Sequence, residues 1–338
     1  MASRYNRRKH RNVLFKLFLV CVLFVIAAVD IWHGVMLFDQ QQPVVYGDLD
    51  ARFGKEYISY KGASYRPRTG LSTFLLMGVD QRENVQSNVS FRSGGQADFL
   101  QLVVIDTQAK AIRRIQIDRD TMAEITVLGV LGNELGTSTQ QICLAHGFGD
   151  GQELSCRYTV EAVSRLLFGI EIDGYYALNM SGIPVFNELL GGVTVQVDDD
   201  FSEHDPAMFP GAVVTLNGEQ AELFVRSRMT IGDGTNESRM RRQQQYLSSA
   251  LVLAAERLQQ DDQFLAVMLE GLAPYAVTDI SRGRMINESN KANRYDIQET
   301  ISLQGEYIIG EDGFVEFHAD SDSLKQCVLQ LFYEPVLL

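Results

Sequence analysis

The 338-residue sequence has little of several features that define whole classes of protein. Its 7 prolines and 28 glycines follow no repeat of fixed period, which excludes collagen-like chains and solenoid arrays. A single run of residues is apolar enough to cross a bilayer, which excludes transporters and channels with several spans. The net charge of −13 argues against a general nucleic-acid binder, so no nucleic acid is expected as a partner.

Few cysteines and histidines are available for metal binding or nucleophilic catalysis. The 4 cysteines form no C-x-x-C pair and the 5 histidines have no zinc-ligand spacing, so a zinc enzyme is not expected. The chain also lacks the G-x-S-x-G, G-x-x-x-x-G-K-[ST] and H-E-x-x-H motifs. Cys143 and Cys156 flank a loop of mostly glycine and polar residues, and two interpretations stay open. They form a disulfide outside the cell, or they are two unpaired thiols.

The amino terminus is basic and then apolar. Residues 1–16 carry six Lys and Arg and no acid, and an apolar run extends from residue 13 to residue 38. This order predicts a cytoplasmic tail (1–12), a transmembrane anchor (13–38) and an extracytoplasmic remainder, hence a single-pass protein of the cell membrane. The alternative is a cleaved signal peptide, because the uninterrupted apolar core at 17–29 is short. No small-x-small cleavage site follows this core, which favours the anchor.

The charges are distributed unevenly along the chain. Residues 17–338 hold the other 24 of the 30 Lys and Arg and all 43 Asp and Glu, a net charge of −19. A cluster of arginines in so acidic a region is not expected from random surface composition. Such a cluster indicates an anionic ligand, or carboxylates that lie between the arginines.

Apolar residues that alternate with polar ones predict strands in the first part of the exported region. After a stalk at 39–70 of mixed composition, strands are expected at 73–79, 98–106 and 111–117. The link at 107–110 is short enough for a hairpin, so the last two strands are expected to be antiparallel neighbours. Arg113 and Arg114 are expected to alternate across an edge strand, without a role in chemistry.

Helical periods alternate with strand periods through the rest of the chain. Helices are expected at 159–167, 181–190, 218–225 and 239–258, strands at 175–179 and 193–197, a helix start at 276–280, and a turn and strand at 310–317. Asn217 and Gln220 fit a capping box, and Gly191 fits a left-handed helix end. Because composition does not change abruptly, residues 71–338 are expected to form one α/β domain. Its central mixed sheet would carry helices on both faces, as an α-β-α sandwich does.

Charged residues gather where the predicted strands begin or end. Asp80 and Arg82 follow the first strand, Asp98 opens the second, and Arg119 and Asp120 follow the third. Five more arginines fall within seventeen residues: Arg226, Arg228, Arg239, Arg241 and Arg242. Guanidinium groups pair bidentately with phosphate oxygens. Asp80 and Asp98 are the carboxylates most naturally placed to hold Mg²⁺ beside such an anion.

Each of these residues also has a purely structural interpretation. Arg226 and Arg228 can cap the carboxyl end of a helix, Asp120 can belong to a turn, and Arg241 can lie on a solvated face. Residues 239, 242 and 243, by contrast, share one helix face and can point together. The chemical interpretation is favoured because separate acid–arginine junctions recur in one exported domain.

The order of several motifs resembles the LytR-CpsA-Psr (LCP) family. The resemblance covers about residues 72–258 and depends on FLLMGVDQR at 74–82, IDRDT at 117–121, LGGV at 190–193, LNGEQA at 216–221, VRSR at 225–228 and RMRRQQQ at 239–245. It implies a membrane-anchored extracytoplasmic enzyme with an α-β-α sandwich and an apolar groove for a lipid. Such enzymes move glycopolymers from a polyprenyl-pyrophosphate carrier to peptidoglycan.

The resemblance also implies roles for individual residues. The catalytic residues would be Asp80, Arg119 and Arg228, Mg²⁺ would bind Asp80 and Asp98, and the pyrophosphate would bind Arg82, Arg119, Arg226, Arg228, Arg239 and Gln243. A peptidoglycan hydroxyl would attack the phosphate next to the glycan, giving a phosphodiester and polyprenyl phosphate. Two alternatives stay open: a pyrophosphatase that uses water at the same site, and a noncatalytic wall-associated or regulatory surface protein.

Three positions depart from the motifs of the family. Arg92 lies six residues before Asp98, where the family usually has an arginine two residues before the acid. Asp118 replaces the usual proline before Arg119, and Asn236 stands where an acid is common.

Overall fold

A computed structural model of the chain describes residues 58–81, 85, 94–129, 132–227, 230–234, 236–261, 263–292 and 295–336. The predicted tail (1–12), the predicted anchor (13–38) and the first part of the stalk lie outside these residues. Among the helices that are described, none has the length and apolar character needed to cross a bilayer.

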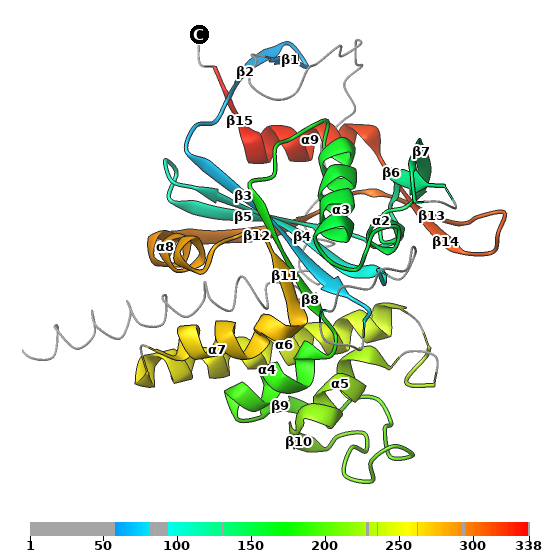
Figure 1. The fold of residues 1–338 in the computed structure, drawn as a ribbon, viewed down its shortest axis with the longest axis vertical. Coiled ribbons are helices and arrows are strands. Elements are labelled where there is room, and N and C mark those ends of the chain that lie inside the picture. Colours follow the sequence, from blue (N-terminus) through cyan, green and yellow to red (C-terminus); the bar gives the residue numbers. More distant parts are fainter. Residues whose placement is uncertain are drawn as a thin grey trace, which may run out of the picture.

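A six-stranded mixed sheet lies at the centre of the fold, in the order β11-β8-β3-β4-β5-β12 (Figure 1). Its strands are β3 (Leu71–Val79), β4 (Ala97–Asp106), β5 (Ala111–Ile117), β8 (Gly174–Asn179), β11 (Ala276–Thr278) and β12 (Asp296–Ser302). β3, β4 and β5 are antiparallel neighbours, while β8 runs parallel to β3 and β12 runs parallel to β5. The predicted hairpin between β4 and β5 is confirmed.

The prediction that Arg113 and Arg114 lie on an edge strand is wrong. β12 pairs with β5, so β5 is an inner strand and both arginines are buried. Nη1 of Arg113 donates to Oδ2 of Asp106 at 2.7 Å, and Nη2 of Arg114 donates to the carbonyl of Gln298 at 3.2 Å. Local periodicity carries no sign of this pairing, because β12 follows β5 only much later in the chain.

Helices cover both faces of the sheet, as the sequence predicts for an α/β domain (Figure 1). One face packs against α2 (Leu144–Gly147), α3 (Glu153–Leu166) and α9 (Ser321–Phe332), the other against α7 (Phe264–Leu272) and α8 (Arg282–Ala292). Alternation along β3 serves both cores, since Leu75 and Met77 face the first group of helices and Phe74 and Leu76 the second. Each such fully buried side chain contributes roughly 1.5–3 kcal/mol.

Besides the two cores on the faces of the sheet, a separate hydrophobic cluster, here called the second cluster, extends the domain beyond the sheet. It is built from α4 (Gly182–Leu190), β9 (Val193–Gln196), β10 (Val213–Leu216), α5 (Gly218–Arg226), α6 (Asn236–Gln260) and part of α7. The predicted capping box is confirmed: the Asn217 side chain accepts from the Gln220 amide at 2.8 Å, and the Gln220 side chain accepts from the Asn217 amide at 2.9 Å. Gly191 ends α4 in the left-handed region, at φ 83°. These caps fix where α5 begins and where α4 ends.

Two helix starts differ from the prediction. α3 begins at Glu153, before the expected start at residue 159. The helix start expected at 276–280 is wrong: Ala276–Thr278 is β11, which pairs with β8, and η1 (Ala273–Tyr275) precedes it. The helix α8 begins only at Arg282. Three residues are too few to show a strand period, so the pairing partner decides their structure.

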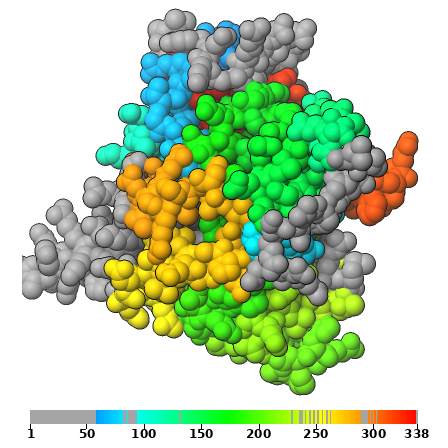
Figure 2. Space-filling model, viewed as in Figure 1, coloured from blue at the N-terminus to red at the C-terminus, as the bar shows by residue number. Residues whose placement is uncertain are grey.

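Short strands lie around the central sheet. They are β1 (Ile58–Tyr60), β2 (Ala63–Pro67) and β15 (Tyr333–Pro335) in one sheet, and the hairpins β6 (Met122–Leu128) with β7 (Glu134–Gln141) and β13 (Gly305–Ile309) with β14 (Val315–Ala319). Residues 58–67, expected in the stalk, thus form strands, and β2 pairs with β15. Figure 2 shows the β13–β14 hairpin, in orange, projecting from one side of the surface.

The disulfide interpretation of Cys143 and Cys156 is wrong, because both are free, buried thiols. Sγ of Cys156 instead lies 3.8 Å from Nε2 of the buried His146, whose Nδ1 lies 2.6 Å from the carbonyl of Gly94. Burial raises the pKa of Cys143 to about 12, so this thiol stays protonated. His146 is a packed core residue, because it is buried and its ring nitrogens face Cys156 and the carbonyl of Gly94.

The buried Arg113–Asp106 pair makes a prediction about stability. Arg113→Ala removes one partner of a pair in which both side chains are less than a tenth exposed. We expect a loss of roughly 3–5 kcal/mol in the free energy of unfolding, measured in urea, because the buried Asp106 carboxylate loses its shortest ion pair and keeps only Arg68, at 3.6 Å. Arg66→Ala is the matched control: its pair with Glu334 spans 2.6 Å but is exposed, so we expect a loss of about 1 kcal/mol or less. Equal losses would contradict the argument.

Candidate functional site

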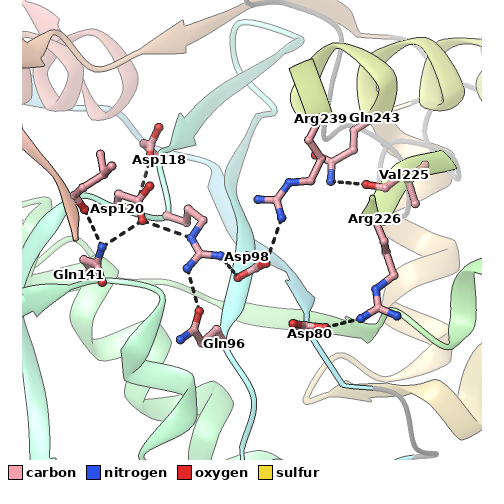
Figure 3. Close-up of polar contacts among 12 residues, drawn as sticks. Asp80, Gln96, Asp98, Asp118, Asp120, Gln141, Val225, Arg226, Arg239 and Gln243 are labelled. Carbon is pink, nitrogen blue, oxygen red and sulfur yellow. Dashed lines mark hydrogen bonds and ion pairs between the residues drawn. The ribbon is translucent and has the colours of Figure 1, made fainter. Parts of the chain in front are cut away.

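The strand order brings Asp80, Asp98 and Arg119 to one edge of the sheet (Figure 3). β3 ends at Val79, which lies opposite Ala97 at the start of the antiparallel β4. The amide of Asp80 donates to the carbonyl of Gln96 at 2.9 Å, which holds Asp80 beside the start of β4. β5 runs antiparallel to β4 and therefore ends at the same edge, where the loop carrying Arg119 follows it.

Asp98 is at the centre of this edge, between two arginines. Its Oδ1 accepts from Nη1 of Arg119 at 2.5 Å, and its Oδ2 lies 3.8 Å from Nη1 of Arg239 on α6. The Asp98 side chain is only 9% exposed. Burial raises its pKa, the neighbouring Asp80 raises it further, and the two arginines oppose the rise. A carboxylate from the sheet thus joins arginines from two distant segments.

The Arg119 guanidinium is held on several sides. Its Nη2 donates to Oε1 of Gln96 at 2.7 Å, and its Nε lies 3.3 Å from Oδ1 of Asp120. Asp120 therefore supports Arg119 directly, beyond the structural turn considered for it. Gln96 is a site residue that the sequence did not single out, because an amide in a glycine-rich loop carries no motif.

Arg226 lies at the carboxyl end of α5 and connects two acids. Its Nη2 lies 3.1 Å from Oδ1 of Asp80, and its Nη1 donates to Oε1 of Glu222 at 2.5 Å. The side chain of Asp80 is 47% exposed, against 20% for Arg226. A pocket of about 380 Å³ opens beside Arg226 and is lined by Glu219, Glu222, Leu223, Arg226 and Ser227. Asp80 and Arg226 form the solvent-accessible part of the site.

The start of α6 holds the end of α5 in place. Nε of the buried Arg242 donates to the carbonyl of Phe224 at 3.1 Å, and its other nitrogens bond to the Ser227 carbonyl and to Asp199. Nε2 of Gln243 donates to the carbonyl of Val225 at 3.1 Å. These bonds satisfy carbonyls that the helix end leaves free. Gln243, expected to bind pyrophosphate, thus bonds to backbone here, and of the helix face at 239, 242 and 243 it is Arg239 that reaches Asp98.

Arg82 and Arg228, expected to bind pyrophosphate, lie outside the described residues, as does Arg92. Their roles stay predictions from the sequence. Five of the predicted site residues that are described come together at one edge of the sheet, here called the acid–arginine edge: Asp80, Asp98, Arg119, Arg226 and Arg239.

The chemistry of this edge fits a hard cation with phosphate ligands. Across the described ranges, no three His, Cys, Asp or Glu side chains converge as a complete metal cage. Mg²⁺ usually takes one or two carboxylates and fills its remaining positions with water and substrate phosphates. Asp80 and Asp98 are two such carboxylates, and Asp80 disfavours ionisation of Asp98. A divalent cation between them would relieve this repulsion, so the residues present fit Mg²⁺.

Comparison with known proteins identifies the family. The model of the LytR_cpsA_psr family matches residues 53–332. The chain belongs to this family. The match includes the whole sheet, the second cluster and the acid–arginine edge.

Three similar proteins illustrate the degree of similarity. The polyisoprenyl-teichoic acid–peptidoglycan teichoic acid transferase TagU of Halalkalibacterium halodurans is 25% identical over 243 residues, which cover 70% of each protein. The cell wall biosynthesis protein LcpA of Corynebacterium glutamicum is 26% identical over 205 residues, 53% of this chain and 39% of that protein. The crystal structure of gbs0355 from Streptococcus agalactiae has a TM-score of 0.60 at 21% identity, covering 78% of this chain and 87% of the other. This likeness shows that the LytR_cpsA_psr fold is shared.

The buried Asp98 makes a prediction about pH. Its folded pKa is raised, so the unfolded chain loses this proton first as the pH rises above about 3.8. The free energy of unfolding of the wild type, relative to that of Asp98→Asn, should therefore fall as the pH rises above about 3.8. Asp200→Asn is the control of opposite sign. Hydrogen bonds from Ser202 lower the pKa of Asp200. The free energy of unfolding of the wild type, relative to that of Asp200→Asn, should therefore rise as the pH rises toward about 3.8. Urea unfolding between about pH 3 and 7 measures both differences, and equal signs would contradict the assignment.

Proposed function

We propose that this chain transfers a glycopolymer from a polyprenyl-pyrophosphate carrier to a hydroxyl of peptidoglycan, forming a phosphodiester. The observation that carries the proposal is the meeting of Arg119, Arg226 and Arg239, from distant segments, with two carboxylates at one sheet edge. Membership of the LytR_cpsA_psr family supports it, as does the name of the H. halodurans relative, which specifies transfer of teichoic acid to peptidoglycan.

The proposed reaction breaks a phosphoanhydride bond of the carrier diphosphate and forms a phosphate ester bond to peptidoglycan. The oxygen of a peptidoglycan hydroxyl attacks the phosphorus next to the glycan. The bond from that phosphorus to the bridging oxygen breaks, and polyprenyl phosphate leaves with the electron pair. The hydroxyl proton passes to a carboxylate. Asp80 is the more accessible acceptor for it, at 47% exposed, because Asp98 is enclosed between Arg119 and Arg239.

The arginines would bind and orient the diphosphate. Without substrate, their charges are balanced by Asp80, Asp98 and Glu222. A diphosphate would take over part of this role, with bidentate bonds from guanidinium groups that already lie in place. Because the groups are positioned before the substrate arrives, they stabilise developing charge with little reorganisation. Arg82 and Arg228 are expected to join them.

Mg²⁺ is proposed to bind Asp80, Asp98 and phosphate oxygens, where it would neutralise charge on the diphosphate. The predicted anchor at 13–38 would keep the enzyme beside its lipid carrier, at the outer face of the cell membrane. The acceptor, peptidoglycan, lies on the same side of the membrane.

The first test is loss of the planar guanidinium at the exposed end of the site. Arg226→Lys keeps the charge but loses the fork. We expect kcat for transfer of glycan from a polyprenyl-pyrophosphate donor to peptidoglycan to fall by about 10²–10³-fold. Stability should change by about 1 kcal/mol or less, because the pair is partly exposed. Arg241→Ala is the control on the same helix as Arg239: its exposed side chain contacts Ser238, and transfer should be unchanged.

Other outcomes of that assay point to other functions. Release of glycan phosphate with water as the only acceptor would indicate a pyrophosphatase. No Mg²⁺-dependent turnover of any kind would indicate a noncatalytic surface protein.

The second test separates metal binding from turnover. MgCl₂ with inorganic pyrophosphate should raise the Tm of the wild type, since a ligand of the folded state at 100 times its Kd adds about 2.7 kcal/mol. Asp80→Asn and Asp98→Asn should lose most of the shift, while Asp200→Asn should keep it. The comparison is made within each variant, with and without MgCl₂, so any destabilisation by the substitution cancels. A full shift in both variants would contradict the assignment of the metal ligands.

A further inference from the structure

The β13–β14 hairpin is bonded to the loop that carries Arg119, although it lies far along the chain. The amide of Phe317 donates to the carbonyl of Asp120 at 2.8 Å. Nε2 of Gln141, at the end of β7, bridges the two elements: it donates to the carbonyl of Val315 at 2.6 Å and to Oδ1 of Asp120 at 3.2 Å. Figure 3 shows the Gln141 side chain pointing toward Asp120. The hairpin thus supports the carboxylate that contacts Nε of Arg119.

The hairpin also holds the residue before Arg119. The hydroxyl of Tyr307 donates to Oδ2 of Asp118 at 2.7 Å. Oδ1 of Asp118 accepts from the amide of Asp120 at 2.8 Å, so the Asp118 carboxylate spans the turn on both sides of Arg119. The ring of Tyr307 packs on that of the buried Phe317 at 4.8 Å, which fixes the direction of the hydroxyl. Tyr307 is 61% exposed, so its hydroxyl contacts Asp118 at the surface of the protein.

The residue at position 118 explains why this loop needs side-chain bonds to hold it. The motif that this loop resembles has proline before the arginine, and a proline ring fixes the backbone φ angle. An aspartate leaves that angle free. In this chain, side-chain bonds from β13 and β7 hold Asp118 and Asp120, where a proline would restrict the backbone directly.

We propose that Tyr307 and Gln141 are positioning residues of the transferase: they hold Asp118 and Asp120 and thereby set the Arg119 guanidinium for the diphosphate. The inference rests on the proposed function and adds two residues to it. Neither side chain contacts Asp98 or Asp80. Both act through the loop.

Tyr307→Phe tests the inference with the loss of one oxygen. The ring contact with Phe317 is kept, so we expect an unchanged Tm. We expect kcat for transfer to fall roughly tenfold, below the 10²-fold that a displacement of about 1 Å can cost. Affinity for inorganic pyrophosphate with MgCl₂, measured by calorimetry, should fall about fivefold, since Arg119 contributes one of several phosphate contacts. Ile309→Ser is the matched control: it lies on the same strand with a side chain 68% exposed, and both quantities should stay at the wild-type value.

A double-mutant cycle identifies the route of the effect. If Tyr307 acts through Asp118, then Tyr307→Phe should cost nothing further in an Asp118→Ala background. Gln141→Leu should reproduce the loss from the side of Asp120.

The outcomes separate this inference from the proposed function. A wild type that transfers glycan while Tyr307→Phe matches Ile309→Ser in kcat and pyrophosphate affinity would overturn the inference and leave the function standing. A fall in Tm that accounts for the lost activity would also overturn it, because Tyr307 would then be structural. A wild type without transfer would end the proposed function. The pyrophosphate affinities alone would then decide whether Tyr307 positions Arg119.

Discussion

The structure depends on the carboxylate of Asp98, which is only 9% exposed to solvent. Asp98 belongs to the central sheet, Arg119 to the loop after β5, and Arg239 to the start of α6. A buried charge is costly unless it is paired, so the sheet and the second cluster are joined where Asp98 meets both arginines. The same arrangement leaves three guanidinium groups close together in a strongly acidic region. Positive charge is thereby concentrated where the proposed diphosphate would bind.

The supports of the site come from parts of the chain that have no motif of their own. α6 fixes the end of α5 through Arg242 and Gln243, and so fixes Arg226. Gln96 and Asp120 hold Arg119 from two sides. The residues that would touch the substrate are few, while the residues that hold them extend to the last strands of the domain. A change far from the site can therefore alter how the proposed diphosphate substrate would be bound.

Much of this architecture could be predicted from the sequence. Alternation within β3, β4 and β5, the capping box at Asn217 and the helix end at Gly191 are local patterns, and local physics decides them. What could not be predicted depends on partners. Pairing with β12 makes β5 an inner strand, and pairing with β8 makes residues 276–278 a strand. The Gln243 side chain donates to the backbone of α5. Periodicity shows which residues avoid water, but it does not show which distant segment covers them.

The direction of β3 has a consequence for how the proposed anchor at 13–38 would position the domain. β3 begins near the sheet of β1, β2 and β15, is nine residues long, and ends at the acid–arginine edge. At about 3.3 Å per residue, the two ends lie roughly 26 Å apart. If the chain leaves the bilayer at residue 38, as the proposed anchor implies, its entry into the fold and its reactive edge are at opposite ends of one strand. For a lipid headgroup to be bound there, the domain would have to tip this far edge back toward the bilayer.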